Sequence, residues 1–150
     1  MLLRDLERTI DWGDGMLNAV PRPLRKLGFG FDIPTGISKT LYDLEFPSPL
    51  LVSSFKDDAS LIDCWLMLGM GGATFKTILR SPRSGNTKPR IQEVSVDGAP
   101  ALINAMGLPG KGVNGLKAVL DTAKFWQHGR PIGISIGGNS AEEYLFNVRE

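Results

Sequence analysis

The chain has 150 residues, enough for one domain with its own core, and its 42% hydrophobic and 22% charged residues are ordinary for a soluble globular protein. Seventeen basic and sixteen acidic side chains leave a formal charge of +1, which excludes a global field that attracts nucleic acid or anionic lipid. Cys64 is the only cysteine, which excludes an intramolecular disulfide, and no apolar run reaches the ~18 residues of a membrane helix. We therefore expect a cytoplasmic protein.

Residues 1–45 differ in pattern from the rest and are expected to form an N-terminal extension of short helices and loops. Apolar side chains at helical spacing predict a short amphipathic helix at its start. They are Leu2, Leu3, Leu6 and Ile10. Residues 11–15 (Asp-Trp-Gly-Asp-Gly) are expected to break this helix, and the prolines of residues 21–23 to break the next stretch of chain. An edge segment is expected around residues 38–46.

The second segment, residues 46–150, alternates apolar runs with helical stripes. Residues 49–55 predict a strand that is buried on both faces. The aspartates of residues 57–58 can cap the helix after this strand, and the glycines of residues 69–72 end it. Residues 73–79 then predict a second strand.

A third repeat of the pattern completes the chain. The apolar stripe of residues 113–126 predicts a helix, and residues 131–136 predict a third buried strand. Ser140 and Glu143 have the spacing of a capping box, so a last helix is expected to start at Ser140. Strands that alternate with helices indicate an α/β fold with a parallel sheet, and three such units indicate the first part of a larger fold.

Small hydroxyl side chains and one lysine stand where strands end. Ser53 and Ser54 could bind the edge of a planar ring, or could be ordinary small residues at a strand-to-loop junction. Lys76 interrupts an apolar strand, so its ammonium either holds a partner or extends to solvent with its stem buried. Thr77 could donate to the same ligand or serve only as a strand former.

The segment of residues 76–90 holds five cationic side chains and no acidic one. Such a segment could bind an anion or an RNA backbone, but no aromatic residue lies among the cations to stack on bases. A solvated basic loop is the simpler expectation. His128, in a turn expected at the surface, is assigned no role, and no residues have the spacing of a metal site.

Asn104 is the strongest candidate for a ligand contact, because an amide offers a donor and an acceptor in one plane. Met106, Gly107 and Leu108 could add backbone donors at the close approach that glycine permits. The alternative is an asparagine in an ordinary turn. Ser135, inside the third strand, could face the same site or be satisfied locally.

These motifs, in their order and spacing, resemble the N-terminal half of the dihydroorotate dehydrogenase family over residues 47–139. The matching pieces are Ser48-Pro49, Lys76-Thr77, Gly85-Asn86 with Pro89-Arg90, Asn104-Ala105-Met106-Gly107-Leu108-Pro109 and Ser135-Ile136-Gly137. The resemblance implies that residues 46–150 are the first three units of a parallel (β/α)8 TIM-type barrel, incomplete alone. It also implies FMN as cofactor and the oxidation of dihydroorotate to orotate in pyrimidine biosynthesis.

The resemblance assigns roles to single residues. Those implied to line FMN are Ser53, Ser54, Lys76, Thr77 and Ser135. Those implied to line dihydroorotate or orotate are Lys76, Asn104, Met106, Gly107 and Leu108. No catalytic base is identified in residues 1–150, so we expect a complementary C-terminal barrel segment or chain, an oligomer, and no nucleic acid. Fumarate, NAD and quinone remain open as electron acceptors, and a quinone would favour a peripheral location on the inner face of a membrane.

Two other functions remain open. Phe55, where the resemblance implies a glycine, could crowd the flavin and would then indicate a diverged, non-catalytic barrel subunit. The basic segment of residues 76–90 leaves an RNA- or anion-binding module as the other alternative.

Overall fold

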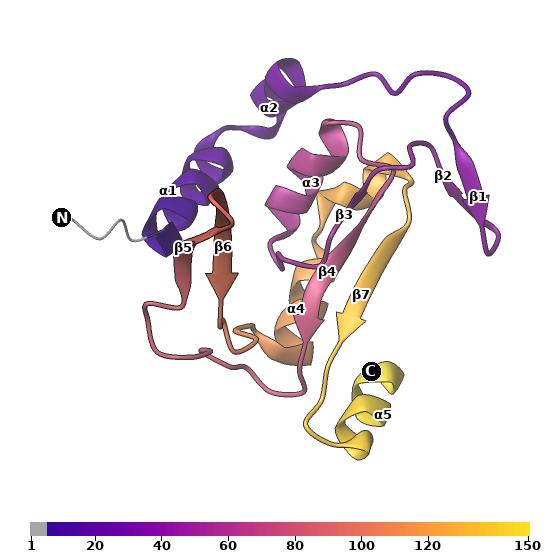
Figure 1. Cartoon of the computed structure of the whole chain (residues 1–150). Coiled ribbons are helices and arrows are strands. Elements are labelled where there is room, and N and C mark those ends of the chain that lie inside the picture. Colours follow the sequence, from indigo (N-terminus) through magenta and orange to yellow (C-terminus); the bar gives the residue numbers. More distant parts are fainter. Residues whose placement is uncertain (1–5) are drawn as a thin grey trace.

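Three parallel strands lie at the centre of the computed structural model, which describes residues 6–150 (Figure 1). They are β3 (Leu51–Val52), β4 (Gly72–Ile78) and β7 (Ile132–Ile136), in the order β3-β4-β7. The α-helix α3 (Ala59–Met67) connects the first pair, and α4 (Gly112–Asp121) lies between the second pair in the chain. The predicted α/β fold with a parallel sheet is therefore confirmed, although the first strand is shorter than expected.

The core forms where α3 and α4 pack on β4. Its largest fully buried side chains are Phe75, Phe125, Ile62 and Leu66. The rings of Phe75 and Phe125 lie 5.5 Å apart. Burying side chains of this size stabilises a fold by about 1.5–3 kcal/mol each, so this cluster holds the parallel strands and their helices together.

The helix predicted over residues 113–126 is wrong at its C-terminal end. The α4 helix ends at Asp121, and a separate 3-10 helix, η1 (Lys124–His128), comes next. Ala123 between them is extended, with φ −71° and ψ 130°. The indole Nε1 of Trp126 donates to the Leu120 carbonyl over 3.0 Å, so a side chain takes an acceptor near the helix end and the chain turns there.

Two antiparallel hairpins lie outside the parallel sheet. Their strands are β1 (Lys39–Leu41), β2 (Leu44–Phe46), β5 (Ile91–Val96) and β6 (Ala99–Asn104). The first hairpin occupies the expected edge segment. The second one was not predicted, and its turn residues Asp97 and Gly98 have φ values of 50° and 81°, as a type I′ turn requires.

The N-terminal extension consists of α1 (Leu6–Ala19) and α2 (Arg22–Phe29), while Leu2 and Leu3 lie outside the described residues. The break predicted at residues 11–15 is wrong, because α1 runs through both glycines. A glycine costs a helix only about 1 kcal/mol, and side chains of α1 are tied to the body of the protein. Asp14 pairs with Lys56, and Asn18 donates to Asp58 over 3.3 Å. The prolines separate the two helices as expected.

The last helix, α5 (Ala141–Arg149), starts where the capping pattern predicts. The Ser140 hydroxyl accepts from the Glu143 backbone N–H over 3.3 Å. The reciprocal half of the predicted box is wrong: the Glu143 carboxylate accepts from the backbone and side-chain N–H groups of Asn139, at 2.7 and 2.9 Å. These bonds lower the pKa of Glu143. Among the described residues, no helix combines the length and the apolar character needed to cross a bilayer.

Candidate functional site

A cavity of about 900 Å³ opens beside the C-terminal ends of β3 and β4. Its walls come from α1, the loop after β3, the start of α3, the end of β4 and the β5–β6 hairpin with the turn after it. Its lining includes Ser54, Lys76, Thr77, Asn104, Met106 and Leu108. The structure therefore brings six of the expected site residues to one place, although they come from three separate parts of the chain.

Lys76 has a carboxylate partner in this cavity. Its ammonium lies 3.2 Å from Asp57 Oδ2, with 23% of the lysine side chain and 18% of the aspartate side chain exposed. Asp57 therefore pairs with Lys76, and of the two aspartates that could cap α3 only Asp58 does so. The Asp58 Oδ1 accepts from the backbone N–H groups of Ser60 and Leu61, at 2.8 and 3.1 Å. Lys76 is thus held in place at the strand end and is not a free cation.

The serines expected at the site lie differently from one another. Ser54 lines the cavity. Ser135 reaches its edge only through Thr77, with the two hydroxyl oxygens 2.9 Å apart across β4 and β7. Ser53 accepts with its carbonyl from the Phe55 N–H over 2.9 Å, and its side chain does not line the cavity defined by the described residues.

The turn after β6 is shaped by Asn86, which the sequence offered only as part of a motif. The Asn86 side chain donates to the Ala105 carbonyl over 2.8 Å, and its backbone N–H donates to the Met106 carbonyl over 3.0 Å. Gly107 has φ +73°, and a Cβ there would lie 2.6 Å from Asn86 Oδ1. Close packing against Asn86 thus requires Gly107, which does not line the cavity, while Met106 and Leu108 do.

Helix α1 is joined to the hairpin side of the cavity by a buried carboxylate. Glu7 accepts from Arg90 Nη2 over 2.6 Å and from Nε over 3.1 and 3.2 Å, and Lys88 Nζ lies 3.2 Å away. The hydrogen bond from Arg90 is the main cause that lowers the pKa of Glu7. The same bond raises the pKa of Arg90. The extension therefore forms a wall of the cavity.

These contacts also correct the expectation of a solvated basic loop over residues 76–90. Three of its five cations face carboxylates, namely Lys76, Lys88 and Arg90. Arg80 lies over the Phe146 ring at 4.1 Å, and Arg83 donates to Asn139 over 3.2 Å. All five therefore have partners within the chain.

Two aromatic side chains also line the cavity. Phe55 and Trp65 meet edge to face with ring centroids 6.4 Å apart, and both line the cavity. Phe55 is 51% exposed, so its ring is accessible to solvent. The cavity thus combines a polar edge, made of an amide, a hydroxyl and an ion pair, with aromatic side chains in the same lining, and this combination suits a planar polar ring.

A second polar cluster joins α2 and η1 to α3. Asp63, whose side chain is 4% exposed, accepts from Arg22 Nε and Nη2 at 2.8 and 3.0 Å, and its Oδ1 lies 2.9 Å from His128 Nε2. Burial raises the pKa of Asp63, but the hydrogen bonds from Arg22 and His128 outweigh it and leave that pKa lowered. His128, expected in a surface turn, thus lies at the end of η1 and contacts Asp63. No local signal could show this, because its partner is 65 residues away.

Comparison with known proteins gives consistent results. The family model for dihydroorotate dehydrogenase matches residues 37–150. The dihydroorotate dehydrogenase (quinone) of Polynucleobacter necessarius is 34% identical over 109 residues, which is 72% of this chain and 31% of that protein. The enzyme of the same name from Thermus thermophilus is 34% identical over 118 residues, with 72% and 33% covered. The chain thus spans about a third of the length of the curated relatives it matches.

A solved structure supports the fold. The crystal structure of DHODH in complex with ferulenol from Eimeria tenella aligns with a TM-score of 0.73 at 22% identity, over 98% of this chain and 39% of that one. The three parallel strands and their helices are therefore part of a β/α barrel fold.

Proposed function

The chain belongs to the dihydroorotate dehydrogenase family, and we propose that it forms the leading part of an FMN-dependent barrel that oxidises dihydroorotate to orotate in pyrimidine biosynthesis. One observation carries the proposal. Lys76 from β4 and Asn104 from the end of β6 line the same cavity beside the C-terminal strand ends, where β/α barrels build their active sites.

The substrate role rests on the polar edge of the cavity. Asn104 would orient the pyrimidine ring through its amide, which can donate and accept in one plane. The turn of residues 106–108 would close over the ring, since its shape is already fixed by Asn86. Lys76 would face the ligand with a positive charge whose position Asp57 maintains. These three elements bind and orient, and none of them removes a proton.

The cofactor role rests on the hydroxyls and the volume of the cavity. A volume of about 900 Å³ lies at the upper part of the range for small-molecule sites, which suits a flavin beside a substrate. We assign Ser54, Thr77 and Lys76 to the flavin edge, with Ser53 and Ser135 supporting the strand ends around it. FMN would supply the acceptor for the hydride that leaves the substrate.

A complementary part of the barrel must provide what this chain lacks. Within the described residues, β3 pairs only with β4, and β7 pairs only with β4, so both outer edges of the sheet are open for further strands. Five carboxylates line the cavity. Glu7, Asp14, Asp57 and Asp58 are engaged in ion pairs or hydrogen bonds, and the charge of the fifth, Asp11, acts on Arg90. We therefore propose that the proton acceptor and the flavin phosphate contacts come from a C-terminal segment or chain, in an assembly that is an oligomer.

A quinone is the acceptor that we propose for the second half of the reaction. The relatives from Polynucleobacter and Thermus carry the name dihydroorotate dehydrogenase (quinone). In this chain Ile10 and Leu17 of α1 and Leu102 of β6 give the cavity an apolar side. Such a side suits an apolar acceptor, and it would place the protein at the surface of a membrane.

A diverged, non-catalytic barrel is the second candidate, and two observations favour it. The exposed Phe55 ring lines the cavity, where it could crowd a flavin. Lys76 is already paired with Asp57. The third possibility, an RNA-binding loop, loses support because each cation of residues 76–90 has a partner within the chain.

Binding of orotate to the purified whole protein tests the proposal. Asn104→Leu should weaken orotate binding by about tenfold or more, because a buried polar contact to the ligand is lost. Asn114→Leu, at an exposed position of α4 outside the cavity, is the matched control and should bind as the wild type does. Equal affinity of the Asn104 variant and the wild type would refute the assignment.

A further inference from the structure

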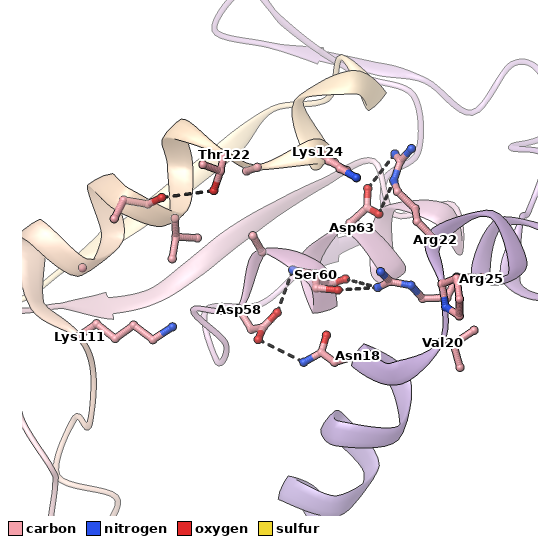
Figure 2. A pocket seen from close by; sticks show the side chains of 16 residues that line it. Asn18, Val20, Arg22, Arg25, Asp58, Ser60, Asp63, Lys111, Thr122 and Lys124 are labelled. Carbon is pink, nitrogen blue, oxygen red and sulfur yellow. Dashed lines mark hydrogen bonds and ion pairs between the residues drawn. The ribbon is translucent and has the colours of Figure 1, made fainter.

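A second cavity, of about 730 Å³, lies between the end of α1, the start of α2, the first turn of α3 and the outer side of α4 (Figure 2). It adjoins the site described above, because Asp58 and Lys111 line both. Its other charged residues are Arg22, Arg25, Asp63 and Lys124. None of these four lines the first cavity, so the second one has a chemistry of its own.

Arg25 is the unusual residue of this cavity. It is only 7% exposed, and it forms no ion pair with any carboxylate of residues 6–150. Its Nη1 donates to the Ser60 carbonyl and hydroxyl, at 3.1 and 2.6 Å, and to Cys64 Sγ at 3.1 Å. Its Nε is buried and has no partner. Figure 2 shows the side chain extending across the cavity towards Ser60. A buried cation without a counter-ion is costly.

Arg22, on the same helix and in the same cavity, shows the contrast. Its guanidinium forms two hydrogen bonds with the Asp63 carboxylate, at 2.8 and 3.0 Å. Asp63 is thus already paired with Arg22 and His128. The other acid of the cavity, Asp58, caps α3 and accepts from Asn18. Neither carboxylate therefore compensates Arg25.

The remaining cations of the cavity are two lysines. Lys111 and Lys124 are exposed, and neither forms an ion pair with another described residue. The cavity lining thus holds four cationic and two acidic side chains, which leaves a net charge of +2. The wall on the side of α4 carries the small apolar side chains of Ala118 and Val119, with the polar Thr122 and Ala123 just after the helix end. An anion with a compact apolar body would match both the charge and the wall.

We propose that this cavity binds a small soluble phosphomonoester, whose phosphate is the missing counter-ion of Arg25. Arginine binds phosphate oxygens through several N–H donors, and its bonds to a charged acceptor are about twice as strong as neutral ones. Lys111 and Lys124 add charge around the phosphate, while the apolar wall of α4 faces the organic group. The volume lies within the range of small-molecule sites.

Calorimetric titration of the whole protein with phenyl phosphate tests the proposal. The wild type should bind it, and inorganic phosphate should bind more weakly because it has no apolar body. Arg25→Gln should weaken binding of phenyl phosphate by at least about tenfold. The double variant Lys111→Gln, Lys124→Gln changes only exposed residues and should weaken binding by about two- to fivefold. Lys117→Gln, on α4 but outside the cavity, should bind as the wild type does.

A stability measurement separates a ligand site from a purely structural arginine. In phosphate-free buffer Arg25→Met should melt no lower than the wild type, because it removes a buried charge that has no counter-ion. Phenyl phosphate should raise the melting temperature of the wild type and leave that of the variant unchanged. A variant that melts well below the wild type in phosphate-free buffer would contradict an uncompensated charge.

Three results would overturn the site itself. The first is no binding of phenyl phosphate to the wild type up to about 10 mM. The second is unchanged binding by both the Arg25→Gln and the double lysine variants. The third is Arg25-dependent binding to phosphatidic acid vesicles without binding of phenyl phosphate, because this would assign the anion to a lipid and not to a soluble ligand.

Discussion

Asp63→Asn is expected to loosen the attachment of the N-terminal extension to the barrel. The substitution keeps the shape of the side chain but removes the charge that Arg22 and His128 share. Breaking a buried pair costs about 3–5 kcal/mol. The Arg22 side chain is 26% exposed, so water can solvate its charge in the variant. We therefore expect a cost at the lower end of this range, about 3 kcal/mol. Each ~1.4 kcal/mol changes an equilibrium constant about tenfold, so the equilibrium population of the locally opened state should rise about a hundredfold.

Hydrogen exchange measured by mass spectrometry on the whole protein is the assay. Peptides that cover α2 and η1 should exchange about a hundredfold faster in the variant, whereas peptides from α5 should not change. Asp121→Asn, at the exposed end of α4, is the matched control and should leave α2 and η1 as they are. The reasoning is refuted if α2 keeps its protection, or if α5 loses protection to the same extent.

The stability difference between the wild type and Asp63→Asn should depend on pH with a defined sign. The pKa of Asp63 is lowered below its ordinary value of 3.8 in the folded protein. Its contribution to stability is therefore fully present above pH 3.8 and is lost as the pH falls through the lower, folded pKa. The wild type and Asp63→Asn should thus differ at neutral pH and converge in strong acid. A difference that persists unchanged there would show that the charge is not the cause.

Three further substitutions test other parts of the structure. Lys76→Met should weaken orotate binding to the whole protein by about tenfold or more, with Lys117→Met as a control that should bind normally. Glu7→Gln removes the charge that holds α1 to the hairpin, so the α1 amides should exchange faster; unchanged α1 protection would contradict the attachment. Ser140→Ala removes the cap of α5 and should destabilise that helix by about 1 kcal/mol, seen as faster exchange of α5 amides alone.

The parallel sheet could be predicted because its signals are local. The apolar run of β4 and the aspartates before α3 produce a strand and a capped helix wherever they occur. The hairpin β5–β6 had such a signal too, since Asp97-Gly98 is a typical type I′ turn sequence. Its second strand ends at Asn104, so the strand pattern overlaps with the ligand motif that begins there.

Other features could not be read from the sequence, because they depend on distant partners. Glu7 and Arg90 are 83 residues apart, and their contact joins the start of α1 to the hairpin side of the cavity. Lys76 illustrates the same limit. Its position in an apolar strand indicated that it needs a partner, but only the fold shows that this partner is Asp57. Residue types thus predicted residues that line one cavity, and tertiary contacts decided which charges they pair with.

Anaerobic addition of dihydroorotate to the purified whole protein tests the central claim most directly. If the cavity of Lys76 and Asn104 holds FMN beside dihydroorotate, the preparation is yellow, its visible flavin absorbance bleaches on addition of dihydroorotate, and bound orotate shifts the spectrum. A colourless protein that takes up no FMN would contradict the claim. A flavin band that dihydroorotate leaves unchanged would instead identify the diverged, non-catalytic barrel.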